Sequence, residues 1–410
     1  MTTTSCAAPS ATARPPLLSR ALLLRFATVL GASSSFFLLL AVVPLYAAGS
    51  GGAPGLATGS LMLATVLGEL VTPRLVARFG YRWALSAGLA LMGGPALVLT
   101  VSGSAVWITA VCLARGLGFA LTVVAGGALT ASLIPAERRG EGLALAGIVS
   151  GVPSLLGLPL GVWLAGRVGY GPVCAAGGLA ALVAVAAVPG MPGGRENREN
   201  RENRENRENR ENREKRHAGV VAGMRTGALA RPTAVFAATA LGAGVIVTFL
   251  PAAVPASMSG LVAAALFVQP AASTAARWFA GRIGDRRGPA GLVLPGLLAS
   301  AAGLAVTALT GSATAVLAGV ALFGAGFGIT QNATLTLMYT RVSADGYGTV
   351  SALWNVAYDG GMGAGAVGCG AVAAGTGFPA AFALTAALML LALGPARRDR
   401  GAPARSDSRP

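Results

Sequence analysis

Charged residues are scarce in this sequence, and several reactive residue types are scarcer still. Only 11% of the 410 residues are charged and 6% are aromatic, with one histidine and four cysteines. Soluble domains carry about 25% charged residues, so the shortage excludes an ordinary soluble domain. The single histidine, His217, lies in a polar stretch, which excludes a histidine-based metal site or catalytic triad within the apolar segments. We expect a membrane protein without a cofactor or metal.

Several catalytic and metal-binding motifs are also missing. The cysteines show no paired spacing, so they give no signal for a disulfide or a metal site. No GxxxxGK[ST] loop is present to hold nucleotide phosphates, which argues against a primary pump. Neither HExxH nor GxSxG occurs, which argues against a membrane-embedded hydrolase. We therefore predict that the chain is not an enzyme.

Long apolar stretches are what the sequence has in abundance, since 54% of its residues are hydrophobic. A membrane-spanning helix needs about 20 apolar residues. The sequence supplies such stretches almost back to back and predicts an all-α membrane protein with twelve transmembrane helices. The expected spans are 21–47, 55–76, 81–102, 104–133, 141–165, 170–189, 233–255, 258–279, 289–310, 312–340, 346–373 and 377–394.

The formal net charge of +16 is distributed unevenly along these spans. Basic residues follow spans 2, 4, 6, 8, 10 and 12, whereas the loops on the other side carry only Arg167. Loops with excess lysine and arginine stay in the cytoplasm, so we expect both termini there, in a multi-pass protein of the cell membrane. The same rule explains the excess of basic residues by the orientation of the chain in the lipid bilayer. We therefore expect the bilayer as a partner and no nucleic acid.

A charged repeat divides the spans into six and six. Six copies of Arg-Glu-Asn run from Arg195 to Asn212, with nothing apolar to bury. We interpret them as a low-complexity cytoplasmic linker, with a charged helix or a docking segment as alternatives. Two parallel six-helix halves around a midplane site are one known transporter arrangement. The expected units are a disordered N-terminus (1–20), a first half (21–189), the linker (190–232), a second half (233–394) and a cytoplasmic tail (395–410).

Two acidic residues lie deep inside expected spans, Asp359 and Glu69. A charge at the centre of a membrane helix costs at least about 2.5 kcal/mol, so such residues usually serve ion or proton pathways. Asn355 shares a helical face with Asp359, and Trp354 and Tyr358 adjoin it. Glu69 either takes part in coupling or pairs with an arginine near the cytoplasmic surface, because Arg74 follows it closely.

The polar residues of span 10, Gln331 and Asn332, have two interpretations. They form part of the polar wall of a cavity together with Asn355, or they make hydrogen bonds between helices that are worth about 0.6 kcal/mol each.

A loop motif between spans 8 and 9 carries the clearest family signal. Residues 281–288 read Gly-Arg-Ile-Gly-Asp-Arg-Arg-Gly, with Gly281, Asp285, Arg286 and Gly288 at the positions of the pattern Gly-x-x-x-Asp-Arg-x-Gly. This resembles the loop signature of the major facilitator superfamily. In that family it forms a cytoplasmic gate, in which Asp285 would cap a helix and pair with an arginine. The first-half copy keeps Arg78, Gly80 and Arg82, but Pro73 and Ala77 replace the glycine and the acid.

Spans 4 and 5 resemble twelve-span drug–proton antiporters of the same family. Arg115 in span 4 lies near the membrane midplane and resembles the arginine of proton-coupled members, with a structural role as the alternative. Span 5 carries Gly151, Pro153 and Gly157, similar to the antiporter signature Gly-x-x-x-Gly-Pro, although Val152 interrupts the match. Glycines four residues apart also let helices pack closely, which explains the same residues without antiport.

The resemblance implies a secondary transporter that works by alternating access, as a monomer on a small-molecule substrate with protons. We expect proton-coupled efflux of an uncharged, cationic or amphipathic organic compound, with Asp359, Arg115 and Glu69 as coupling residues. The cavity is expected to include Trp354, Asn355, Gln331, Asn332, Phe36 and Phe249. The alternatives are a proton symporter that imports a sugar or another nutrient and, more remotely, a membrane sensor that does not transport.

Overall fold

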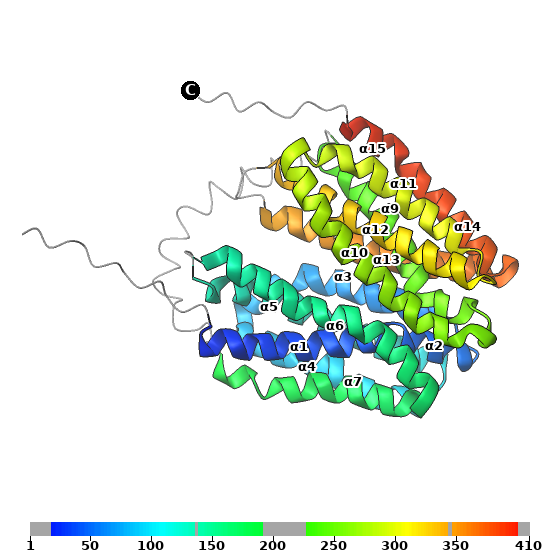
Figure 1. The fold of residues 1–410 in the computed structure, drawn as a ribbon. Helices are drawn as coiled ribbons and strands as arrows, with labels where there is room; N and C mark the ends of the chain where they lie inside the picture. The colour runs from blue at the N-terminus through cyan, green and yellow to red at the C-terminus, as the bar shows by residue number, and fades with distance from the viewer. Residues whose placement is uncertain (1–17, 136–137, 192–226, 343–346, 401–410) are drawn as a thin grey trace, which may run out of the picture.

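The chain folds into two helical bundles that lie side by side (Figure 1). The computed structural model describes residues 18–135, 138–191, 227–342 and 347–400, and these residues form helices and connecting turns without a strand. The N-terminal half comprises α1 (Arg20–Leu40), α2 (Val42–Gly49), α3 (Pro54–Phe79), α4 (Tyr81–Val98), η1 (Leu99–Val101), α5 (Ala105–Leu133), α6 (Arg139–Val168), α7 (Tyr170–Val185) and η3 (Val188–Gly190).

The C-terminal half repeats this succession of long helices. It comprises α9 (Ala230–Ala253), η4 (Ala256–Met258), α10 (Ser259–Arg287), α11 (Ala290–Thr307), α12 (Ala313–Tyr339), α13 (Tyr347–Thr376), α14 (Phe378–Met389), η6 (Leu390–Ala392) and α15 (Leu393–Arg400). Because α1 with α2 makes one segment and α14 with α15 makes another, the described residues contain twelve long helical segments. The predicted all-α fold of two six-helix halves is confirmed.

Four consecutive helix pairs are joined by a glycine with a positive φ. Gly80 (φ 85°) joins α3 to α4, and Gly288 (φ 81°) ends α10 just before α11. Gly169 and Gly377 occupy the corresponding joints before α7 and α14. Side chains with a Cβ rarely adopt this backbone conformation, so glycine allows the chain to reverse within one or two residues. The joint thus has the same construction in both halves.

The first and last segments are each broken into two helices. In the first, α1 ends at Leu40 and α2 begins at Val42. Pro44 lacks the N–H that would bond the Leu40 carbonyl in a continuous helix, which explains the break. Capping marks other helix starts: the hydroxyl of Ser19 accepts a hydrogen bond from the Leu22 amide at 3.2 Å, and Ser104 caps α5 in the same way.

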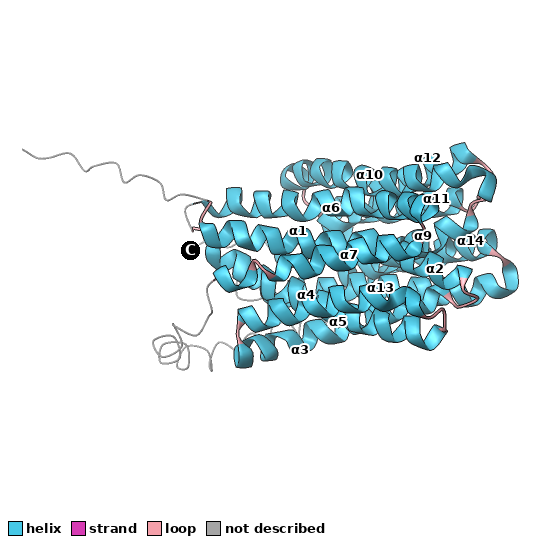
Figure 2. Cartoon of the chain, turned by 90° about the horizontal axis from the view of Figure 1, so that it is seen from below, coloured by secondary structure: helices cyan, strands magenta, loops and turns pink. Residues whose placement is uncertain are grey.

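The two ends of the bundle differ in charge. We call the end with η3 and the start of α9 the linker end, and the end with the α2–α3 connection the far end; Figure 2 shows the helices running between them. Among described residues, Arg167 is the basic residue at the far end. The linker end carries Arg74, Arg78, Arg82, Arg138, Arg282, Arg286, Arg287, Arg341, Arg397 and Arg398.

Two helix pairs make the main contacts between the halves, α3 with α13 and α6 with α10, and α9 also contacts α2 and α3. At the far end, a methyl group added at Gly55 would collide with the carbonyl oxygen of Ala366, and one added at Gly59 would collide with Val367. The hydroxyls of Thr58 in α3 and Thr248 in α9 are 2.9 Å apart and form a further contact between the halves at this end. Small residues let helix backbones approach closely, so the far end of the α3–α13 contact is tightly closed.

Ten of the described helical segments are long and apolar enough to cross a membrane, and α10 and α13 are not among those ten. Arg277 lies in α10, and Asp359 lies in α13. The two segments that are least like ordinary membrane spans therefore carry charged residues, and each contacts the N-terminal half.

Two predicted boundaries of the C-terminal half need correction. The cytoplasmic tail was expected from residue 395, but α15 continues to Arg400, and Asp399 is fully buried. The half was expected from residue 233, but α9 begins at Ala230. Ion pairs to Asp399 hold both extensions, as described below. The Arg-Glu-Asn repeat and residues 1–17 of the predicted disordered N-terminus (1–20) lie outside the described residues, whereas Arg20 already belongs to α1.

Candidate functional site

Asp359 lies where α13 faces α3 of the other half. It is only 5% exposed, and within the described residues it forms no ion pair. A methyl group added at Gly363, one helical turn from Asp359, would lie 3.0 Å from the Cβ of Met62 in α3. Residues four apart share a helical face, so Asp359 faces the same contact, one turn nearer the linker end.

Glu69 approaches Asp359 from the opposite side of this contact. It follows Met62 by two helical turns and therefore lies on the same face of α3. The two carboxyl groups are close enough to interact electrostatically. The Oε2 atom of Glu69 is buried without a hydrogen-bond partner. One interpretation of Glu69 was an ion pair with an arginine, and no such pair forms among the described residues. Two carboxyl groups on different halves thus face each other.

Arg277 is a charged residue of the central region that sequence reasoning missed. It lies ten residues before the end of α10, and its side chain is exposed. The guanidinium interacts electrostatically with Tyr358, the neighbour of Asp359 in α13. It belonged to expected span 258–279, so the signal was present as a single arginine within an apolar stretch.

Aromatic rings from three helices stack beside these charged groups. Trp354 of α13 stacks on Phe236 of α9 with ring centroids 4.3 Å apart, and its indole N–H donates to the Thr334 hydroxyl at 3.3 Å. Tyr358 lies nearly parallel to Trp354 at 6.4 Å, and Phe327 of α12 is 6.0 Å from Tyr358. We call Phe236, Phe327, Trp354 and Tyr358 the aromatic wall. Stacked rings offer a flat apolar surface for a planar ligand.

The predicted polar residues lie near this wall. Asn355, Gln331 and Asn332 are half-buried, and their side chains make no hydrogen bond within the described residues. Asn332 approaches α10, since a methyl group added at Gly281 would lie 3.7 Å from its amide nitrogen. Hydrogen bonds between helices, one interpretation of Gln331 and Asn332, are thus not formed within the described chain, and the cavity interpretation stays a prediction.

Arg115 is sealed within the N-terminal half. It is 2% exposed, and its Nη2 donates to the carbonyl oxygen of Ser35 in α1 at 3.1 Å. Its Nε has no hydrogen-bond partner, and no acidic residue pairs with it in the described chain. Phe36, next to Ser35, stacks on Phe119 with ring centroids 3.7 Å apart. Arg115 is therefore separated from Asp359 and Glu69, with which the sequence had grouped it.

A second arginine, Arg25, is buried in the same half and was also missed. Its Nε donates to the Gly126 carbonyl at 3.0 Å and to the Thr130 hydroxyl at 3.1 Å, and its Nη1 donates to Thr28 at 2.7 Å. These acceptors on α1 and α5 satisfy much of the guanidinium without an acidic partner. Arg25 therefore holds two helices of one half together.

Phe249, a predicted substrate residue, lies at the far end. It is 1% exposed, and its ring centroid is 5.7 Å from that of Phe378. It also approaches Gly55 of α3 and Gly370 of α13. Phe249 therefore packs at the closed end of the contact between halves, away from the aromatic wall.

The gate motifs lie at the linker end, and the two copies are not joined. Asp285 was expected to cap a helix and pair with an arginine; instead it is an exposed residue in the last turn of α10, before Arg286 and Arg287. The reason is that α10 continues to Arg287, so Asp285 precedes the turn at Gly288. No described arginine forms an ion pair with Asp285. In the first copy, Arg82 donates to the Met191 carbonyl at 2.6 Å within its own half, and Arg78 lies over the Phe79 ring.

The span-5 motif lies on α6, which contacts both halves. A methyl group added at Gly157 would collide with Phe37 and Leu38 of α1, whereas one at Gly151 would meet no atom within 4 Å. Pro153 is buried between these glycines in sequence. Gly157 therefore allows close packing within the N-terminal half, while Gly151 lies in open surroundings.

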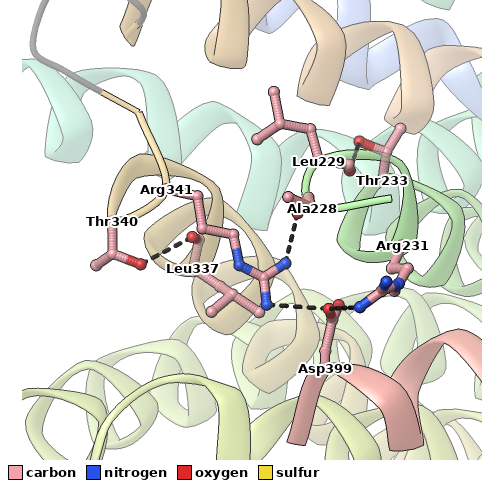
Figure 3. Close-up of polar contacts among 8 residues, drawn as sticks. All are labelled: Ala228, Leu229, Arg231, Thr233, Leu337, Thr340, Arg341 and Asp399. Atoms are coloured by element: carbon pink, nitrogen blue, oxygen red, sulfur yellow. Dashed lines mark hydrogen bonds and ion pairs between the residues drawn. The ribbon is translucent and has the colours of Figure 1, made fainter. Parts of the chain in front are cut away.

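A buried ion-pair cluster holds the linker end of the C-terminal half (Figure 3). The Asp399 carboxylate of α15 lies 2.9 Å from Nη2 of Arg341 and 3.7 Å from Nη1 of Arg231. Arg341 also donates to the Ala228 carbonyl. The cluster joins α9, α12 and α15 within one half, so it fixes the bundle rather than lining the space between the halves. Little in the sequence indicated this cluster, because Asp399 lies among arginines in a segment that resembles a solvent-exposed C-terminal tail.

Comparison with known proteins places this arrangement in a family. The model of the Major Facilitator Superfamily matches residues 21–366. The chain belongs to the major facilitator superfamily. No match was found among curated proteins.

Solved structures of this superfamily share the fold. The nucleoside transporter NupG is 13% identical, with a TM-score of 0.70, covering 93% of this chain and 100% of that one. The xylose transporter XylE from E. coli is 14% identical (TM-score 0.67; 95% and 99% covered), and the peptide transporter POT is 15% identical (0.68; 92% and 94%). At these identities the similarity establishes the fold. The family assignment and the shared fold make this chain a multi-pass membrane protein with the transporter fold.

Proposed function

We propose that this protein is a proton-coupled secondary transporter that exports a small organic compound by alternating access. It lies in the cytoplasmic membrane with both termini inside, an orientation supported by the basic linker end. The main observation in support of this proposal is that Asp359 and Glu69 approach each other from opposite halves at the α3–α13 contact.

The coupling follows from the positions of the two carboxyl groups. When both are ionised, like charges face each other across a contact that must open and close, and their repulsion disfavours closure. One bound proton removes the repulsion and lets one carboxyl group donate a hydrogen bond to the other. Proton binding therefore favours closure at this level, and proton release favours separation of α3 from α13. A substrate held between the halves is exposed to one side or the other as they move.

The test is transport in inverted membrane vesicles. Wild-type protein is expected to move a compound from a panel of drugs and dyes when a proton gradient is imposed. Asp359→Asn cannot release a proton, so we expect gradient-driven transport to fall at least about a hundredfold, while Glu69→Gln gives a smaller loss because Asp359 still titrates.

Glu141→Gln is the matched control for loss of one carboxylate. Glu141 is exposed and pairs with Arg138 at 2.6 Å, away from the α3–α13 contact, so full transport is expected. Proton-driven transport by a correctly inserted Asp359→Asn protein at the wild-type rate would remove Asp359 from the mechanism.

The symport of a sugar or nutrient remains the second candidate. One observation favours it: the aromatic wall, flanked by Asn355, Gln331 and Asn332, offers the combination of rings and polar groups that sugars need. Uptake of labelled sugars into energised cells, rather than loss of dyes from them, would decide for this alternative.

A further inference from the structure

The position of Arg277 indicates which class of substrate the central space accepts. In the C-terminal half, α10 packs mainly against α12, and α13 packs mainly against α9. The helices α10 and α13 are also the ones that contact α6 and α3 of the other half. Arg277 lies one turn after Ser273 and one turn before Gly281, and both of these face α12, since a methyl group added at Gly328 of α12 would collide with Ser273, and one added at Gly281 would lie 3.7 Å from the amide nitrogen of Asn332. The exposed side chain of Arg277 leaves α10 on this face and also interacts electrostatically with Tyr358 of α13. The Arg277 guanidinium therefore lies beside α12 and α13, which carry three rings of the aromatic wall.

Arg277 has no anionic partner within the described residues. Asp359 is near Tyr358 but forms no ion pair with Arg277 there, and the nearest acid along α10, Asp285, is two turns away and exposed. The arginines of the N-terminal half differ, because backbone carbonyls and hydroxyls of neighbouring helices hold them. An exposed guanidinium without an ion-pair partner among the described residues is suited to bind an anionic group with two parallel hydrogen bonds.

The aromatic wall lies at the same level of the bundle as Arg277, because its Phe327 is next to Gly328, which packs against Ser273, one turn before Arg277 in α10. Trp354 and Tyr358 are half-buried, whereas Phe236, on which Trp354 stacks, is fully buried. A ligand bound to the guanidinium would extend along these two rings. On the other side of Tyr358, Asp359 and Glu69 would repel additional negative charge.

We propose that the substrate of this transporter is an amphipathic organic monoanion, with its carboxylate on Arg277 and a planar apolar group on Trp354 and Tyr358. The inference rests on the proposed transport function and replaces the uncharged or cationic substrate expected from the sequence. That expectation took the walls of the space as apolar because it overlooked Arg277.

The test is equilibrium binding of tritiated 2-naphthoate to the purified full-length protein in detergent. Neutral 2-naphthamide and cationic 2-naphthylmethylammonium serve as competitors of the same shape. We expect naphthoate to bind at least about tenfold more tightly than either competitor, because its carboxylate forms a hydrogen bond between charged groups with the Arg277 guanidinium. Arg277→Gln should weaken naphthoate binding about tenfold or more and leave naphthamide binding within about twofold. Arg277→Lys should retain part of the preference.

Arg167→Gln is the control for loss of one positive charge. Arg167 lies at the far end over the Trp163 ring, so its removal should leave all three affinities unchanged. Tighter binding of the ammonium compound, equal binding of acid and amide, or no binding of naphthoate to the wild type would overturn the proposal, as would an unchanged preference in Arg277→Gln. If Arg277→Gln does not fold, the order of the three affinities in the wild type still tests whether the site prefers an anion.

This measurement is independent of proton coupling. Selective naphthoate binding without proton-driven flux would contradict the proposed coupling but keep the substrate class. Proton-driven flux of neutral or cationic compounds that Arg277→Gln does not alter would contradict only the substrate class.

Discussion

Charged residues enclosed within one half differ in their surroundings from those at the contact between the halves. In the N-terminal half, Arg25 and Arg115 are 5% and 2% exposed and donate to carbonyls and hydroxyls of their own half. In the C-terminal half, Asp359 and Arg277 belong to α13 and α10, which make the main contacts with the other half. A charge enclosed by one rigid bundle stabilises that bundle, whereas a charge at the contact between bundles changes its surroundings when the bundles move. Location relative to this contact therefore separates structural from functional charges better than burial does.

The largest effect on stability is expected where Arg25 meets α5. A methyl group added at Gly126 would occupy the place of the Arg25 guanidinium. Gly126→Ala should therefore displace Arg25 from its acceptors and cost about 3 kcal/mol of folding free energy, because a buried charge loses its hydrogen bonds. Thermal unfolding in detergent would measure the loss. The adjacent Gly127→Ala is the control, since nothing lies within 4 Å of its added methyl group. Equal stability of the two variants would show that Arg25 is held less firmly than its hydrogen bonds indicate.

The joints at Gly80 and Gly288 test whether the two halves have equivalent stability at a place where their gate-motif sequences differ. Gly80→Ala and Gly288→Ala each force a side chain into a positive-φ conformation, and each should cost about 1–3 kcal/mol. The two losses should be similar even though the gate motif around Gly80 is degraded. Gly291→Ala, at the second residue of α11 with open space around it, should be neutral in the same unfolding experiment. A loss of stability in only one of the two variants would show that the two joints, although alike in structure, contribute differently to the free energy of unfolding.

The smallest stability change is expected at Arg115, and it separates stability from function. Arg115→Met removes a buried charge that has no acidic partner to leave behind, so stability should stay within about 1 kcal/mol of the wild type or rise. Thermal unfolding and proton-driven flux should be measured on the same preparation. If flux is retained, Arg115 is structural like Arg25. If flux is lost from a stable protein, the comparison of the halves fails, because a sealed charge would then serve transport.

The sequence led to the fold because the membrane imposes a simple rule on it. Apolar stretches of about 20 residues must become helices, and their number and charged connections determine the topology. The site followed less completely. Asp359 and Glu69 were identifiable as coupling candidates because an acid in an apolar span is costly, but their approach across the contact was not predicted. An arginine pair was the alternative for Glu69, yet the five residues from Glu69 to Arg74 turn a helix by about 140°, so the two side chains leave α3 in different directions.

Arg277 and Asp399 show why the remaining residues were missed. A single arginine barely lowers the apolar character of a 22-residue window, and only its position opposite Tyr358 distinguishes Arg277 from an arginine at the membrane surface. Asp399 lies in a run of arginines and looked like part of a solvated tail. In the structure it is fully buried because α15 brings it between Arg231 and Arg341, which are remote in sequence.

The sequence by itself determined that this is an all-α membrane protein of twelve segments, divided six and six, with a basic face at one end. Those features depend on local composition, which each segment carries whether or not the others are present. The tertiary structure alone decided which polar groups meet: Asp359 with Glu69 across the halves, Arg277 with Tyr358 between non-adjacent helices, and Arg115 with no acid among the residues that the structure describes. Such pairings depend on how helices rotate and pack against one another, and close glycine contacts such as those of Gly55 and Gly363 fix that packing.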